Sequence, residues 1–168
     1  MITYRAAGPN DAATLDRIFD TSFRDAFAHL YREQDLEAFL SDATIAGWEA
    51  ELGNSVYAFR VAEADGTPVG YAKLGPLKLP IQPERPALSL HQLYILKEHH
   101  GTGIARVLMD WVVDEARSRG ARELYLTVYI DNHRARSLYD RYGFEIVAKY
   151  DFVVGTHVDE DVIMRKLL

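Results

Sequence analysis

The chain has 168 residues, is 48% hydrophobic, and carries a formal net charge of −6 with no cysteine. This length and apolar content predict one domain, residues 1–168, around a single core. The lack of cysteine excludes disulfides, thiolate catalysis and Cys-ligated metals, the acidic balance argues against nucleic acid as the main partner, and no apolar run approaches the ~20 residues of a membrane span.

The first third of the chain predicts one strand and three helices. A short strand over 2–6 precedes Pro9-Asn10-Asp11, which supplies a cap and a first-turn acid for a helix ending near Phe27. Two further helices are predicted over about 33–40 and 43–52. Because the first residues lack the apolar region of a signal peptide, we expect a cytoplasmic protein with no membrane partner.

A hairpin and a loop follow. The runs 56–62 and 68–74 predict strands, since the Asp65-Gly66 pair between them is typical of a hairpin turn. The segment 76–86 contains four of the chain's prolines, so we expect a surface loop there and not a linker between domains.

The second half alternates strands and helices. The predicted elements are a strand over 88–96, a helix over 104–116 stopped by Gly120, a strand over 124–130, a helix over 132–142, and strands over 144–149 and 162–166. A strand–helix–strand crossover implies locally parallel strands in a mixed, otherwise largely antiparallel sheet, which is an α+β arrangement.

The turn between the strand at 88–96 and the next helix reads His100-Gly101-Thr102-Gly103-Ile104-Ala105. Small residues before a helix start let backbone amides approach a ligand, so this turn is typical of a pyrophosphate site. Gly103 is not followed by Lys and Ser/Thr, which excludes the P-loop pattern, and the dinucleotide fingerprint G-x-G-x-x-G is also absent. A helix entry with small residues for packing remains an equal alternative on this segment alone.

Two motifs that follow one another along the chain, one of which includes this turn, resemble those of a known family. The stretch 93–105 together with Asn132-x-x-Ala135-x-x-x-Tyr139-x-x-x-Gly143-Phe144 resembles the GNAT superfamily of acyl-CoA-dependent N-acetyltransferases. The family's phosphate loop reads Arg/Gln-x-x-Gly-x-Gly/Ala, and His100 stands here where Arg or Gln is usual. The resemblance implies the GNAT fold, in which the fourth and fifth strands are parallel and splay apart and helices cover both faces of the sheet.

The resemblance extends to one type within the superfamily. The chain looks like PaiA-type polyamine N-acetyltransferases in Ser22-Phe23-x-x-x-Phe27, Val128-Tyr129-x-x-Asn132, Phe152-Val153-Val154-Gly155 and the ending from Asp161 to Leu168. It departs from them on the fourth strand, which is Glu-rich in those enzymes and has Ser89 and His91 here.

The resemblance also implies a cosubstrate, acetyl-CoA, without a metal, and the residues that bind it. Pantetheine would pair with the backbone of the fourth strand, and the pyrophosphate would lie on the amides of the turn. The implied cofactor residues are Leu93, Tyr94, Ile95, His100, Gly101, Thr102, Gly103, Ile104, Ala105, Arg106, Asn132 and Arg141. Asn132 is equally a helix N-cap, and the two roles are compatible.

The expected catalytic residues are Tyr139, which the resemblance implies, and His91, a candidate base. In the family a tyrosine at the position of Tyr139 protonates the departing thiolate of CoA, and the spacing to Gly143-Phe144 selects it over Tyr142. For the base, many members carry a Glu on the fourth strand that is absent here. His91 shares a strand face with Ser89, Leu93 and Ile95 by the period of two, and its ordinary pKa near ~6.5 suits proton removal. A purely structural His91 and a water relay remain open.

The acceptor is predicted from charge and from the resemblance. Between residues 8 and 53 ten acids face three arginines, a segment charge of −7 that would attract a cationic amine if these helices wall the acceptor site. Solvated helix faces are the alternative. We therefore expect an acyltransferase that acetylates a primary amine of a small, cationic acceptor such as a polyamine.

Other functions remain open from the sequence. The acceptor could be an aminoglycoside, an amino acid or a protein N-terminus, and the chain could be a non-catalytic acyl-CoA-binding regulator. The presence of both Asn132 and Tyr139 favours an enzyme. The assembly state is open, a homodimer included.

Overall fold

The computed structural model describes residues 1–168, which form one seven-stranded sheet in the order β1-β2-β3-β4-β5-β7-β6. The strands are β1 (Ile2–Ala6), β2 (Ala58–Ala64), β3 (Thr67–Pro76), β4 (Ala87–Ile95), β5 (Glu123–Tyr129), β6 (Glu145–Val154) and β7 (His157–Leu167). The helices are α1 (Ala12–Phe27), α2 (Glu33–Ser41), α3 (Ile45–Leu52), α4 (Ile104–Ser118) and α5 (His133–Arg141), with short 3-10 turns η1 (Pro9–Asp11), η2 (Ala28–Leu30) and η3 (Lys97–His99).

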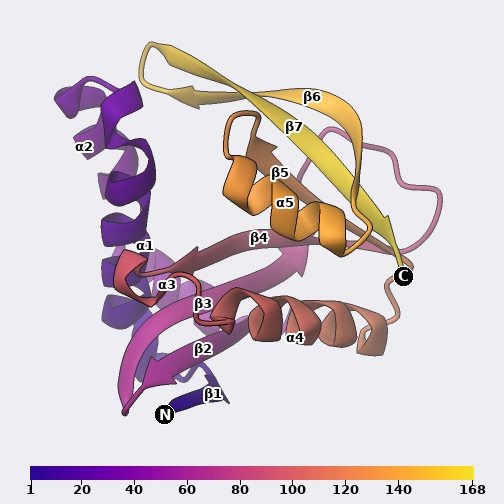
Figure 1. The fold of residues 1–168 in the computed structure, drawn as a ribbon, viewed down its shortest axis with the longest axis horizontal. Helices are drawn as coiled ribbons and strands as arrows, with labels where there is room; N and C mark the ends of the chain where they lie inside the picture. The colour runs from indigo at the N-terminus through magenta and orange to yellow at the C-terminus, as the bar shows by residue number, and fades with distance from the viewer.

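The sheet is divided where its two parallel strands meet. β4 and β5 pair only over Ala87–Ser89 and Glu123–Tyr125, and all other strand pairs are antiparallel. Beyond this short ladder β4 and β5 diverge, so that β1 to β4 and β5 to β7 form two halves of an open V (Figure 1). The predicted α+β class and the predicted splay of the fourth and fifth strands are both confirmed.

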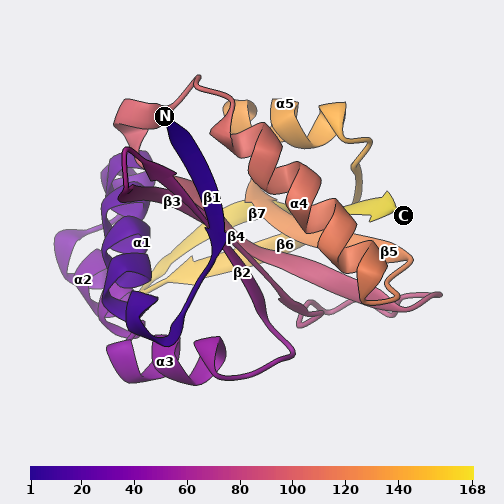
Figure 2. The same cartoon turned by 90° about the horizontal axis from the view of Figure 1, so that it is seen from below.

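Helices cover both faces of the sheet, and each face has its own core, so the prediction of a single core was wrong: the sheet separates two apolar clusters. α1, α2 and α3 pack on one face through an aromatic-rich cluster, whereas α4 and α5 pack on the other (Figure 2). The apolar periodicity explains both cores: Leu15, Ile18 and Phe19 are buried along α1, and Leu108 and Val112 are buried along α4. None of the helices is both long and apolar enough to cross a membrane.

The sequence prediction was wrong about the length of the last two strands. β6 extends to Val154 and β7 begins at His157, so residues 150–161, between the two predicted strands, form the end of a long hairpin. The missed turn is Gly155-Thr156, where Gly155 has φ +59°. Three consecutive acids, Asp159, Glu160 and Asp161, interrupt the apolar pattern before Val162, and this polarity hid the start of β7. The hairpin places β7 between β5 and β6.

The hairpin turn packs against α2, and from this contact we predict the effect of a substitution on stability. An added Cβ at Gly155 would lie 2.3 Å from Cγ of Asp35, whose carboxylate also pairs with Arg32. We expect Gly155→Ala to lower the free energy of unfolding by about 2–4 kcal/mol, from backbone strain plus overpacking. Urea unfolding measures the change.

Gly66 is the matched control for this prediction. It has φ +81° in the β2–β3 turn, and nothing lies within 4 Å of an added Cβ. Gly66→Ala therefore carries the backbone strain alone, about 1 kcal/mol. Equal losses for the two variants would show that the contact between the hairpin and α2 adds nothing to stability.

Candidate active site

A cavity of about 700 Å³ opens where β4 and β5 diverge, between the end of α1, β4, the turn before α4, α5 and β7. Its wall contains most of the residues that the sequence predicted: His91, Leu93, Tyr94, Ile95, His100, Gly101, Gly103, Ile104, Ala105, Arg106, Asn132, Tyr139 and Arg141. Thr102 does not reach the wall, because its hydroxyl turns back and donates to the His99 carbonyl at 2.6 Å. The fold thus brings segments from distant parts of the chain into one site.

The turn before α4 presents a run of free backbone donors. Gly101 and Gly103 adopt the left-handed region at φ +76° and +85°. None of the amides from Gly101 to Arg106 donates to another group of the protein. These amides include the unpaired first turn of a fifteen-residue helix, where the helix dipole is positive. Such a turn can hold an anionic group such as a pyrophosphate.

His100 is held in place by two contacts, and one of them brings the guanidinium of Arg134 to this turn. Its Nε2–H donates to the Ile95 carbonyl at 2.8 Å, and its Nδ1 accepts from the guanidinium of Arg134. Arg134 lies at the start of α5 and also lines the cavity. A guanidinium therefore reaches the turn from α5, although position 100 itself carries none. Sequence reasoning missed Arg134, because only the packing of α5 beside the turn brings the two segments together.

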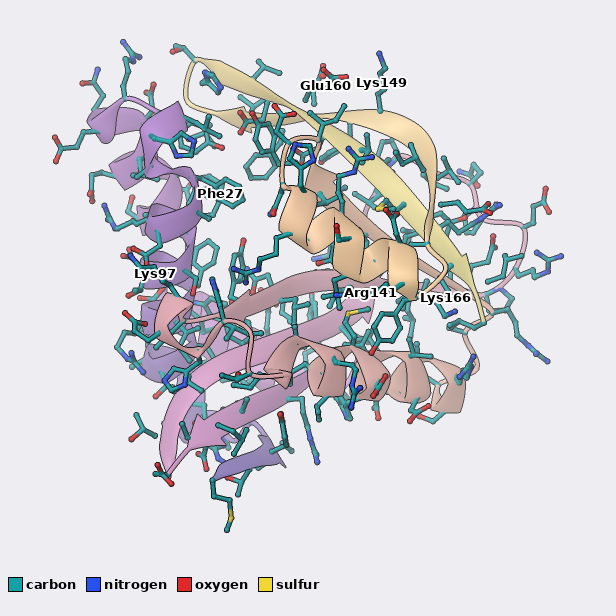
Figure 3. The ribbon with its side chains drawn as sticks, viewed as in Figure 1. Phe27, Lys97, Arg141, Lys149, Glu160 and Lys166 are labelled. Carbon is teal, nitrogen blue, oxygen red and sulfur yellow. The ribbon has the colours of Figure 1, made fainter.

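Further polar groups line the same end of the cavity. The Asn132 side-chain oxygen accepts from the Ala135 amide at 3.3 Å, which is an N-cap, and leaves its NH₂ group free. Figure 3 shows Lys97 in the segment before α4 and Arg141 between α5 and α4, and both residues line the cavity. Together with Arg106 and Arg134 they make this end cationic.

The structure distinguishes the two tyrosines of α5 by their contacts. Tyr139 is buried against Phe144, its hydroxyl makes no hydrogen bond to the protein, and it lines the cavity. Burial raises the pKa of Tyr139, so the hydroxyl keeps its proton at neutral pH. Tyr142 instead donates to the Asp110 carboxylate at 2.5 Å and to the Arg106 carbonyl at 2.9 Å. Of these two tyrosines, only Tyr139 offers a free O–H to the cavity.

The predicted strand face of His91 was partly wrong, because β4 contains a bulge. Lys73 pairs with Gln92 and Leu74 pairs with Leu90, which leaves His91 as the extra residue. His91 therefore packs on Tyr57, on the side of α3, whereas Leu93 and Ile95 contact the core under α4. A period of two does not hold across a bulge.

The surroundings of His91 keep its ring neutral. Nε2 lies 2.7 Å from the Pro76 carbonyl oxygen and must carry the hydrogen, because a carbonyl only accepts. Burial lowers the pKa of His91, and Lys73 and Lys78 lower it further, against the effect of the Pro76 contact. The role of His91 as base stays a prediction, and Nδ1 would be its basic atom.

Two carboxylates of β7, Asp159 and Asp161, line the cavity opposite the cationic turn, and sequence reasoning missed both. Asp159 is engaged by the protein: the Tyr31 hydroxyl donates to it, and His157 Nε2 lies 2.9 Å from it. In Figure 3 Glu160 points to the outer side of the hairpin, as does Lys149. The period of two then turns Asp159 and Asp161 inward.

Asp161 differs from Asp159 in having no partner. It is 7% exposed, lines the cavity, and accepts no hydrogen bond from the protein. Burial, with the neighbouring charge of Asp159, raises the pKa of Asp161 to about 7. Ser22 on α1 is a second such group on the wall, because its hydroxyl is buried without a hydrogen-bond partner.

The acids of the first helices lie elsewhere. Of the ten acids between residues 8 and 53, only Asp25 lines the cavity. Five of the others form ion pairs within the protein, namely Asp11, Asp20, Asp35, Glu37 and Glu51. The negative wall is thus built mainly by β7. A sequence signal existed: Asp159, Asp161 and Ile163 follow the period of two, and the strand face that they share is buried, which is unusual for carboxylates.

Comparisons with known proteins agree with this geometry. A family model described as “Acetyltransferase (GNAT) family” matches residues 16–144. An uncharacterized N-acetyltransferase of Mycobacterium tuberculosis is 33% identical over 157 residues, which cover 94% of this chain and 95% of that protein.

Two solved structures share the fold. The PaiA N-acetyltransferase from Thermoplasma acidophilum, solved in complex with coenzyme A, superposes with a TM-score of 0.82 at 22% identity, covering 100% of this chain and 99% of that one. The yncA protein from Salmonella typhimurium, solved with its cofactor acetyl-CoA, gives a TM-score of 0.73 at 24% identity, covering 100% and 94%.

Proposed function

The chain belongs to the acetyltransferase (GNAT) family, and from this premise we propose that it transfers the acetyl group of acetyl-CoA to a primary amine of a small, cationic acceptor such as a polyamine. The observation that carries the proposal is one cavity that joins the unpaired amides of the α4 turn, the free hydroxyl of Tyr139 and three carboxylates. Each of these groups matches one requirement of acetyl transfer to an amine.

The donor side of the cavity fits acetyl-CoA. The amides from Gly101 to Arg106 would hold the pyrophosphate, and Arg134 and Lys97 would add positive charge. The open edge of β4 beyond Ser89 would pair with the pantetheine amides, because β5 has diverged there. The two structural neighbours solved with coenzyme A and acetyl-CoA support this use of the cavity.

The Tyr139 hydroxyl would protonate the leaving group. A bound thioester supplies an activated acetyl carbonyl, and its sulfur departs as a thiolate that needs a proton. Tyr139 keeps its proton at neutral pH and has no competing acceptor in the protein. Thiols have an ordinary pKa near ~8.5, so the transfer requires a donor that is well placed more than one that is strongly acidic.

The charge of the cavity favours a cationic acceptor. Asp25, Asp159 and Asp161 come from α1 and β7, whereas the cations come from the η3–α4 turn and from α5. A charged amine would therefore be drawn to the wall opposite the phosphate site. Phe27 and Tyr129, whose rings meet edge to face at 6.2 Å, add aromatic surface on that wall, which suits the alkyl chain of a polyamine.

Thiol release from acetyl-CoA over a panel of polyamines, aminoglycosides, amino acids and peptides tests the proposal. We expect spermidine to be acetylated, with a KM that rises with salt because exposed charges are screened beyond ~8 Å at physiological ionic strength. A neutral-bodied amine of similar length should show little salt dependence. Asp25→Asn should weaken the salt response for spermidine alone. Equal rates and equal salt responses for the two amines would contradict a cationic acceptor.

A further inference from the structure

We propose that Asp161 is the catalytic base, whose carboxylate takes the proton from the acceptor's ammonium group. This inference rests on the proposed function and adds to it a residue that the family motifs do not indicate. It starts from an arrangement in the cavity: two adjacent inward carboxylates on β7, one engaged by the protein and one free.

Asp159 is the structural member of this pair. Its two oxygens are used by Tyr31 and His157, which fix the carboxylate against the end of η2 and the start of β7. Burial and the Asp159 contact raise the pKa of Tyr31, so this hydroxyl stays protonated and keeps donating. Asp159 is thus held in place as a fixed negative charge beside Asp161.

Asp161 is the reactive member. Its residue is more than nine-tenths buried, yet its carboxylate has no hydrogen-bond donor in the protein and faces the cavity. An unpaired carboxylate in such a place is costly, because burial removes water without supplying a partner. An ammonium group in the cavity would supply both the missing donor and the missing opposite charge.

The titratable groups around Asp161 come from its own strand and from the neighbouring elements. They are Asp159 on β7, Tyr129 on β5, Tyr150 opposite it on β6, Tyr31 after η2, Tyr94 on β4 and Tyr139 on α5. Tyr94 lies near enough to Tyr139 and Asp161 that both raise its pKa, although burial is the larger cause. The proposed acid and the proposed base therefore lie around one common neighbour. No cation faces Asp161, so nothing in the protein offsets the rise that Asp159 causes in the pKa of Asp161.

The proton balance uses both residues. Asp161 removes one proton from R–NH₃⁺ and releases it to solvent, which leaves R–NH₂ with a lone pair. The nitrogen attacks the thioester carbonyl, the C–N bond forms, and the C–S bond breaks. Tyr139 gives its proton to the sulfur, and the second nitrogen proton restores the Tyr139 hydroxyl. The products are the amide and CoA as a thiol, with one proton released.

A pH profile tests the proposal. With acetyl-CoA and spermidine, or another amine that the panel shows to be acetylated, kcat/KM should rise with pH through an apparent pKa of about 7. Alkyl ammonium groups have a pKa of ~10, so the amine itself does not produce this rising limb of the pH profile. Asp161→Asn should remove the limb and lower kcat/KM by about 100- to 10,000-fold, the range of a lost general base.

Two further variants separate Asp161 from its neighbours. Asp159→Asn retains an acceptor for Tyr31 but removes the charge that helps to raise the pKa of Asp161, so the limb should move to lower pH. His91→Ala should leave the limb in place. CoA-induced thermal stabilisation of each variant checks that it is folded and binds the donor.

The outcomes identify which idea fails. An active wild-type enzyme whose limb persists in Asp161→Asn would overturn Asp161 as the base. A limb lost in His91→Ala instead would assign that role to His91. A wild-type protein that binds acetyl-CoA and acetylates no amine of the panel would contradict the proposed function, and the base with it.

Discussion

Replacing Tyr139 with Phe should lower turnover by about 10- to 1,000-fold while leaving the affinity for CoA nearly unchanged. The change removes only the hydroxyl, which lines the cavity and has no partner in the protein, so packing against Phe144 is retained. Turnover is measured by thiol release, and CoA affinity by thermal stabilisation or calorimetry.

Tyr142→Phe is the matched control on the same helix. It removes a hydroxyl whose single proton is shared between Asp110 and the Arg106 carbonyl, so it should lower the free energy of unfolding by about 1 kcal/mol with little effect on turnover. If Tyr139→Phe kept wild-type turnover, the leaving-group proton would come from solvent or from another residue. If only Tyr142→Phe lowered turnover, the family spacing would have selected the wrong tyrosine.

Replacing Gly101 and Gly103 together with Val should abolish the thermal stabilisation by CoA. Both residues have positive φ, which a β-branched side chain does not tolerate, and the added side chains would stand among the amides that we assign to the pyrophosphate. In the wild type, CoA at ~100 times its Kd adds ~2.7 kcal/mol, or about 5–10 °C in Tm for a chain of this size.

Gly120→Val is the control for backbone strain. Gly120 follows the C-terminal end of α4, has the same φ of +85° as Gly103, and an added Cβ there also meets nothing within 4 Å. It lies away from the cavity that contains Gly103. Gly120→Val should therefore lower Tm and keep the stabilisation by CoA. A full CoA-induced shift in the Gly101→Val/Gly103→Val protein would contradict the phosphate site.

Local patterns in the sequence predicted the parts of the fold that depend on local physics. Apolar spacing along α1 and α4 predicted their buried faces, because the helix period alone decides which side chains share a face. The Gly101–Gly103 turn predicted the free amides at the start of α4 for the same reason: free amides and positive φ are properties of a short segment. The family motifs then predicted the splayed sheet.

Other features could not be read from the sequence because they arise between segments that are far apart in the chain. The bulge at His91 exists only in the pairing of β4 with β3, and it changes the face that counting by two assigns. Arg134 reaches His100 only because α5 packs beside the turn before α4. Half of the ten acids counted between residues 8 and 53 form ion pairs that the sequence does not reveal.

The sequence by itself therefore determined the fold class, the turn that we assign to the donor and the tyrosine that we expect to act as the acid. The tertiary structure decided the electrostatics of the opposite wall, where β7 lies between β5 and β6 and turns Asp159 and Asp161 into the cavity. The physical reason is that the charge state of a carboxylate depends on burial and on its neighbours. For Asp161 the charged neighbour, Asp159, lies on the same strand, but the burial arises only because β7 pairs with β5 and β6, which lie on either side of it in the folded sheet.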